Sequence, residues 1–160
     1  MENNKNMQQM QKMSYKKFSL MMIISFVIMY LVMFLNLIDI KHYHTSLTRI
    51  YMTLLMVAPM AIVMMLMMGN MYPDKKMNMG IMVSGIVVFI VVLFALRSQT
   101  PIGDVQYMKA MIPHHSSAIL TSERANIQDP ELKKLAEDII KAQRKEIAEM
   151  EAMLDRLEKK

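Results

Sequence analysis

The sequence predicts an all-α protein with three transmembrane helices followed by a polar, antiparallel helical hairpin. Three long windows without a charged residue predict the membrane helices, and a change near Asp104 to amphipathic helical periodicity predicts the hairpin. We therefore expect a cytoplasmic polar tail at 1–17, a membrane domain at 18–97 and an extracytoplasmic hairpin domain at 98–160.

The charge-free windows are each long enough to cross a bilayer. They contain 21, 24 and 20 residues, and about 20 apolar residues in a helix span the hydrocarbon core. The expected spans are about 18–38, 50–72 and 77–96. The first is too long, and follows too long a polar tail, to be a cleavable signal peptide. The sequence therefore predicts a multi-pass membrane protein, with the lipid bilayer as a partner.

The net charge of +5 belongs to the membrane part. Residues 1–97 carry nine Lys or Arg against three Asp or Glu, whereas residues 98–160 carry ten against eleven. Nucleic-acid binding is therefore not expected. Of the basic residues near the spans, six lie on the N-terminal side and four on the opposite side. This asymmetry favours a cytoplasmic N-terminus and an extracytoplasmic C-terminal domain in a bacterial cell membrane.

The polar part contains the signals of two packed helices. Asp129 suits an N-cap and Pro130 suits the first helical turn that follows it. Apolar residues recur at helical spacing on both sides of the turn near 127–128, so the two helices should pack antiparallel. Pro113 should kink the first helix or split off its first turn.

Polar residues interrupt the apolar stripes of both predicted helices, at positions that lie level with each other once the hairpin is folded. Folding the chain about the turn sets His115 roughly level with Ile140, and one or two helical turns of tolerance gather a larger set. The set is Met108, Met111, His114, His115, Gln143, Glu146 and Met150. Thioether and imidazole ligands together suit Cu(I) or Ag(I) better than Mg, Ca or Mn. Because the chain has no cysteine, thiolate sites and disulfides are excluded.

The roles within this set are only partly decided by the sequence. Adjacent helical residues point about 100° apart, so His114 and His115 cannot both face one site unless Pro113 distorts the turn. The other histidine is left for a second metal or a neighbouring subunit. Glu146 can accept a hydrogen bond that orients an imidazole, or can itself bind a harder ion. Each methionine alone is also an ordinary filler of irregular core space.

Residues 104–157 resemble the family called domain of unknown function 305. The likeness lies in DVQYMKAMIPHHSSAIL and QRKEIAEM, which match that family at Asp104 and at every member of the set above. YMTLLMVAPM and MYPDKKMN resemble its branch with three preceding spans. The resemblance implies a ferritin-like helical fold, an extracytoplasmic location and a role in copper binding or tolerance. Ser116 and Thr121 depart from the pattern, since many members have glutamine and methionine there.

A ferritin-like bundle needs four helices, whereas the polar part supplies two. Either two chains pair their hairpins or the membrane spans complete the packing, and we expect a homo-oligomer. The resemblance also gives Asp104 and Gln143 as ligands or as supports of the ligands.

Most of the 23 methionines lie in or beside the spans. In the second span they recur every four residues, at Met52, Met56, Met60, Met64 and Met68. Such a stripe can pass Cu(I) along the membrane, but flexible apolar packing is the simpler interpretation. His42 and His44, after the first span, can supply further ligands, form a docking contact or simply lie at the interface.

The leading hypothesis is a membrane-anchored, extracytoplasmic Cu(I)/Ag(I)-binding protein that acts as a buffer or chaperone in metal tolerance. One alternative is a ferritin-like di-metal oxidase, although the Glu-x-x-His pairs of such enzymes are missing from the sequence. Another is a structural membrane oligomer or partner subunit whose polar residues only set the helix register. Since no nucleophile–base pair or cofactor fingerprint is visible, a non-enzymatic role is favoured.

Overall fold

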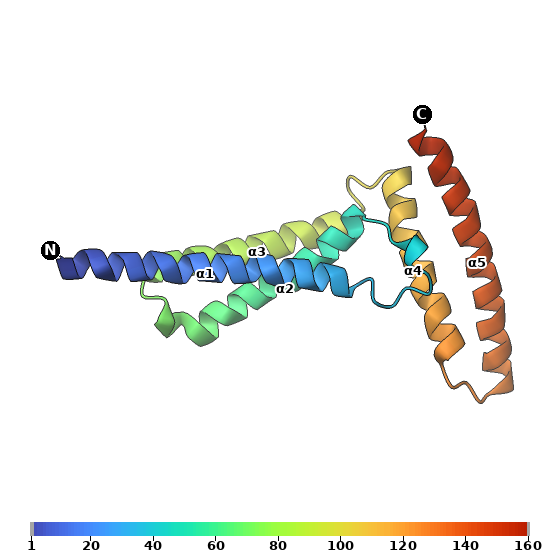
Figure 1. Ribbon diagram of the computed structural model, residues 1–160, viewed down its shortest axis with the longest axis horizontal. Helices are drawn as coiled ribbons and strands as arrows, with labels where there is room; N and C mark the ends of the chain where they lie inside the picture. The colour runs from blue at the N-terminus through green and yellow to red at the C-terminus, as the bar shows by residue number, and fades with distance from the viewer. Residues whose placement is uncertain (1, 160) are drawn as a thin grey trace. The chain divides into compact units, whose positions relative to one another are not determined.

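The computed structural model describes residues 2–159, and the side chains of 14–69 and 71–159 (Figure 1). These residues form α-helices and two short 3-10 helices, and no strand occurs among them. The α-helices are α1 (Glu2–Val32), α2 (Leu47–Met68), α3 (Lys75–Ser98), α4 (Asp104–Arg124) and α5 (Pro130–Glu158). The 3-10 helices are η1 (Ile40–His42) and η2 (Gly69–Met71). The predicted all-α class is confirmed for this part of the chain.

The chain divides into two compact units. The membrane unit comprises Met1–Leu31 and Ile50–Thr100, and the polar unit comprises Val32–Arg49 and Pro101–Lys160. By length and composition, Ser14–Val32, Leu47–Met68 and Lys75–Ser98 can each cross a membrane. The structure is thus compatible with the multi-pass membrane protein that the sequence predicts.

The first span ends earlier than the sequence predicts, at Val32 instead of residue 38. Just beyond this end, Nη1 of the buried Arg49 donates a hydrogen bond of 2.6 Å to the Met33 carbonyl oxygen. The same guanidinium lies 4.2 Å from the centre of the Phe34 ring. A carbonyl left without a partner at the helix end is therefore satisfied by a side chain. The following residues belong to the polar unit, which is larger than the expected 98–160.

In the membrane unit, α2 and α3 approach closely at Gly85. A Cβ atom built on Gly85 would lie 2.9 Å from Cγ1 of Ile62 and 3.4 Å from the Ala58 carbonyl oxygen. Small residues permit such close approach of membrane helices. Of the methionine stripe, Met52 and Met56 are each 43% exposed, as expected for packing at a lipid-facing surface.

In the polar unit, α4 and α5 run antiparallel around an apolar core. Lys109 pairs with Glu158 and Glu123 pairs with Arg144, so residue numbers rise along one helix as they fall along the other. The buried core consists of Met108, Ile112, Ile119, Ile147 and Leu154. Pro113 is fully buried within α4, which is a single helix and is not split at this residue.

A larger side chain at Gly85 is expected to destabilise the membrane unit. The variant Gly85→Leu should lower the free energy of unfolding by about 1–3 kcal/mol, because it overpacks the contact with Ile62. Thermal unfolding of the full chain in detergent measures the effect. Gly80→Leu is the matched control, since a Cβ at Gly80 meets nothing within 4 Å. Equal stability of the two variants would contradict the packing argument.

Candidate functional site

A histidine and a glutamate join the two helices of the polar unit. His115 Nε2, on α4, lies 2.7 Å from Glu146 Oε2, on α5. The His115 residue is only 9% exposed, whereas the Glu146 side chain is 53% exposed. Because a carboxylate accepts hydrogen bonds, the neutral ring carries its proton on Nε2 and keeps a lone pair on Nδ1. Nδ1 is buried and has no hydrogen-bond partner among the described residues.

A cavity of about 550 Å³ lies beside this pair. The residues predicted from the sequence that line it are Asp104, Met108, Met111, His115, Glu146 and Met150. Met153, which follows Met150 at helical spacing, lines it as well, and so do Tyr107, Glu149 and Arg156, which were not predicted. The structure therefore brings together one imidazole, several thioethers and several carboxylates at a single cavity between α4 and α5.

His114 and Gln143 do not line this cavity. The His114 side chain is exposed, and its ring lies 5.9 Å from the ring of His115 at an interplanar angle of 64°. This divergence follows from the 100° step between adjacent residues of a helix. Gln143 is partly buried, and its Oε1 has no hydrogen-bond partner in the described part of the chain. Among the side chains that the structure describes, no three His, Asp or Glu residues group closely enough to hold a metal ion.

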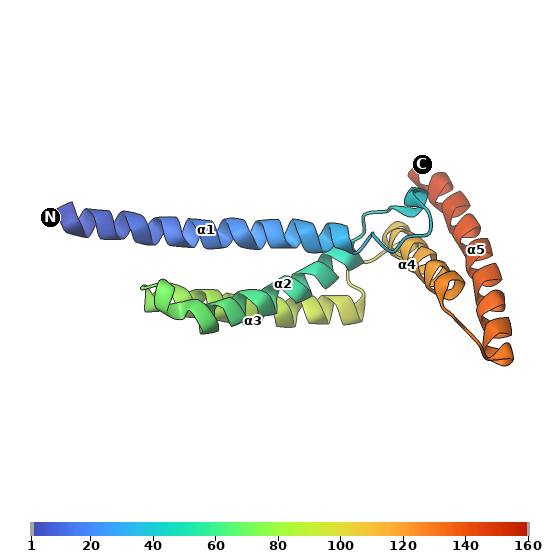
Figure 2. The same cartoon turned by 60° about the horizontal axis from the view of Figure 1, so that its bottom comes forward.

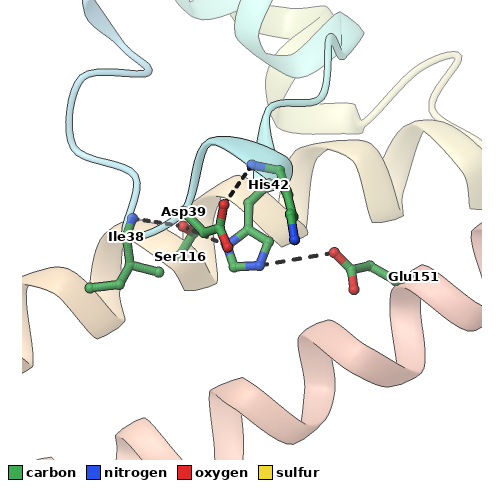
Figure 3. A network of polar contacts seen from close by, with 6 residues as sticks. Ile38, Asp39, His42, Ser116 and Glu151 are labelled. Carbon is green, nitrogen blue, oxygen red and sulfur yellow. Dashed lines mark hydrogen bonds and ion pairs between the residues drawn. The ribbon is translucent and has the colours of Figure 1, made fainter.

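The segment that connects the first two spans contacts α4 through a second polar cluster, shown in Figure 3. The fully buried Ser116 Oγ accepts a hydrogen bond of 3.0 Å from the Ile38 backbone nitrogen and lies 2.9 Å from His42 Nδ1. His42 Nε2 is 3.9 Å from Glu151 Oε1. Neither His42 nor His44 lines the cavity beside His115. In one chain, His42 therefore forms a docking contact, which is one of the roles that the sequence left open.

The pKa of His44 is shifted by burial and by nearby charged groups. Burial lowers the pKa of His44 below its usual value, because it disfavours the charged ring. Lys109 and His42 lower the pKa further, while Glu151 and Glu158 oppose the shift. Burial therefore favours the neutral form of the His44 ring.

Fold and site together define a class: helical proteins with three apolar, span-length helices and a two-helix polar unit that holds a histidine–carboxylate pair beside thioethers. Residues 104–160 match the family model described as Domain of unknown function (DUF305). Over 143 residues the chain is 40% identical to "Uncharacterized protein L153" of Acanthamoeba polyphaga mimivirus, covering 85% of this chain and 90% of that relative. The chain belongs to the DUF305 family, as the sequence motifs indicated. No solved structure matches it.

Removal of the Ser116 hydroxyl should destabilise the polar unit. In Ser116→Ala the Ile38 amide and His42 Nδ1 lose a buried partner, which should cost about 1–3 kcal/mol of unfolding free energy. Urea unfolding and hydrogen exchange at the Ile38 amide measure the loss. The control is Ser117→Ala, which removes an exposed bond to Asn36 and should change stability by less than about 0.5 kcal/mol. Equal effects of the two changes would show that the contact at Ser116 is not structural.

Proposed function

We propose that the protein is a membrane-anchored, extracytoplasmic Cu(I)/Ag(I)-binding protein that acts as a buffer or chaperone in metal tolerance. The observation that carries the proposal is the state of His115: one ring nitrogen is bonded to a carboxylate, and the other is buried without a hydrogen-bond partner among the described residues. A buried nitrogen lone pair without a partner is costly unless the group binds something.

The surrounding side chains suit a soft monovalent metal ion. In this proposal His115 Nδ1 and the sulfurs of Met108, Met111 and Met150 are the ligands, and all four residues line the same cavity. Glu146 holds the Nε2 proton, which orients the ring and increases the basicity of the nitrogen that binds metal. Thioethers also remain metal ligands in an oxidising compartment, where paired thiols would form disulfides.

The expected membrane topology supports an extracytoplasmic role in metal binding. The excess of Lys and Arg on the N-terminal side favours a cytoplasmic N-terminus, so that the α4–α5 hairpin lies outside the cytoplasm of a bacterial cell. The apolar helices anchor it to the bilayer. We also propose a homo-oligomer, because two helices supply only half of a ferritin-like bundle. A di-metal oxidase would need chains to pool their carboxylates, since the described side chains of one chain contain no suitable group of three.

Titration of the full chain with Cu(I) in detergent, against a competing chelator, tests the proposal. His115→Ala should weaken Cu(I) binding at least tenfold, and Glu146→Gln should weaken it by roughly 10- to 100-fold, because the imidazole is no longer oriented by a carboxylate. Met150→Leu, which removes the sulfur and keeps the volume, should also weaken binding.

His114→Ala and Met52→Leu are the matched controls for the histidine and methionine changes. Both residues lie outside the cavity lining, and both variants should bind like the unaltered chain. Unchanged affinity in His115→Ala would refute the proposal. Oxygen consumption with Fe(II) or Cu(I) would instead support the oxidase, and an assembly defect without a binding defect would support a structural role.

A further inference from the structure

The α4–α5 pair has one covered side and one open side. The covered side carries the contacts of Ser116 with Ile38 and His42, and a cavity of about 360 Å³ there is lined by both helices and by residues of the connecting segment. The cavity beside His115 has no lining residue from that segment. The proposed metal site therefore lies on the side that the connecting segment leaves uncovered.

The open side is unusually apolar for the surface of a polar unit. Exposed fractions are 50% for Leu132, 54% for Leu135, 37% for Ile139 and 44% for Met153 on α5, and 53% for Tyr107 on α4. Leu132, Leu135 and Ile139 follow one another at steps of three and four residues, and Met153 lies about four turns beyond Ile139 on the same face of α5. We call these four residues the open stripe, since large exposed apolar side chains on one helix face are typical of an interaction site.

The two helices differ in length, which leaves part of the open stripe without a helix opposite. The α5 helix has 29 residues against 21 in α4, or about 44 Å against about 32 Å. Since Glu123 pairs with Arg144, the first turns of α5 extend past the end of α4 (Figure 2). Leu132 and Leu135 lie on these turns.

We infer that a second copy of the chain covers the open stripe, with the two α5 helices antiparallel about a two-fold axis near Glu146. In this register Leu135 faces the partner's Leu157, and Ile139 faces the partner's Met153. These two pairs are apolar on both sides, and the members of each pair lie at equal distances from the axis because both helices have the same rise per residue.

Charge complementarity favours this register. Along the edge of α5 next to the open stripe, Asp138 faces the partner's Arg156, and Lys145 faces the partner's Glu149. Asp138 and Arg156 are exposed and have no ion-pair partner within the part of the chain that the structure describes. A parallel pairing would instead place each of these charges beside its own copy, where like charges repel.

The same edge disfavours a membrane surface as the occupant. Helices that lie on bilayers carry mainly Lys and Arg on their polar flanks. The flank of the open stripe carries Glu131, Asp138 and Glu149 against Lys145 and Arg156, and Glu146 lies within the stripe. A second copy gives Asp138 and Glu149 a basic partner, whereas anionic lipid would repel them.

The pairing makes the proposed metal site a shared one. Because the axis passes near Glu146, and Glu146 is bonded to His115, the two His115–Glu146 pairs meet at the interface. The partner's α5 then closes the cavity of the first chain and brings the partner's Glu146 to it. The shared metal site rests on the proposed function, whereas metal-free cross-linking tests the pairing of the α5 helices independently of metal binding.

Disulfide cross-linking tests the register, and the absence of native cysteine removes any background. The full-length Ile139→Cys/Met153→Cys double variant, oxidised with diamide in detergent without metal, should run mainly as a covalent dimer on a non-reducing gel. Within one chain these positions are about 21 Å apart along α5, too far for a disulfide. Each single variant should stay monomeric, because its cysteine is equally far from its own copy in the partner.

Control variants decide between the alternatives. The Glu137→Cys/Asp155→Cys pair lies on the opposite side of α5 at the same level and should not cross-link. Cross-linking of Ile139→Cys alone would show parallel helices, and no dimer in the double variant would show that a second copy does not cover the stripe; either result overturns the inference. Leu135→Cys/Leu157→Cys gives a second reading if the first pair disturbs folding.

Charge reversal provides a measurement without cysteine. Asp138→Arg and Arg156→Asp should each raise the dimer dissociation constant roughly fivefold, because like charges then meet across the interface. The double reversal should restore the original constant, since the pair is formed again with its signs exchanged. Additive weakening in the double variant would contradict the proposed contact.

Discussion

The hydrogen bond between His115 and Glu146 is the interaction on which the polar unit depends, since it acts on structure and on chemistry together. It joins α4 to α5 at the level of their shared apolar core, where Ile112 and Ile147 are also buried. It also determines which nitrogen of the imidazole carries the proton, and so which nitrogen is free to bind another group. Replacing the pair by two apolar residues would keep the helices together and lose the chemistry.

Periodicity in the sequence predicts which side chains share a helix face better than it predicts which residues of α4 and α5 lie level with each other. The apolar stripes of α4 and α5 place His115, Glu146 and three methionines on one side, and the structure brings these residues to one cavity. Counting back from the turn sets His115 level with Ile140, whereas its contact is with Glu146, almost two turns further along. The difference arises because α5 is displaced along α4, across the irregular connection Ala125–Asp129. Side-chain packing sets that displacement, and a local pattern does not encode it.

The contacts of the connecting segment are invisible to local sequence patterns for a different reason. His42 and Ser116 are 74 residues apart in the chain, and each residue type is common at interfaces and helix surfaces. Their pairing depends on where the segment leaves the first span, and there the buried Arg49 bonds to the Met33 carbonyl. Sequence analysis counts this arginine only as a topology signal, whereas the structure shows it bound to the backbone at the end of a helix.

The polar unit is assembled from two distant parts of the chain. This has a consequence for biosynthesis. Val32–Arg49 leaves the ribosome before Pro101–Lys160, with two complete spans between them. At typical elongation rates of about 5–20 residues per second, His42 waits roughly 4–15 seconds for Ser116, which follows 74 residues later. During that interval the Ile38 amide and the His42 ring have only water or chaperones to bind. Final folding of the polar unit must therefore follow synthesis of the last membrane helix, and cannot proceed in the order in which the segments are made.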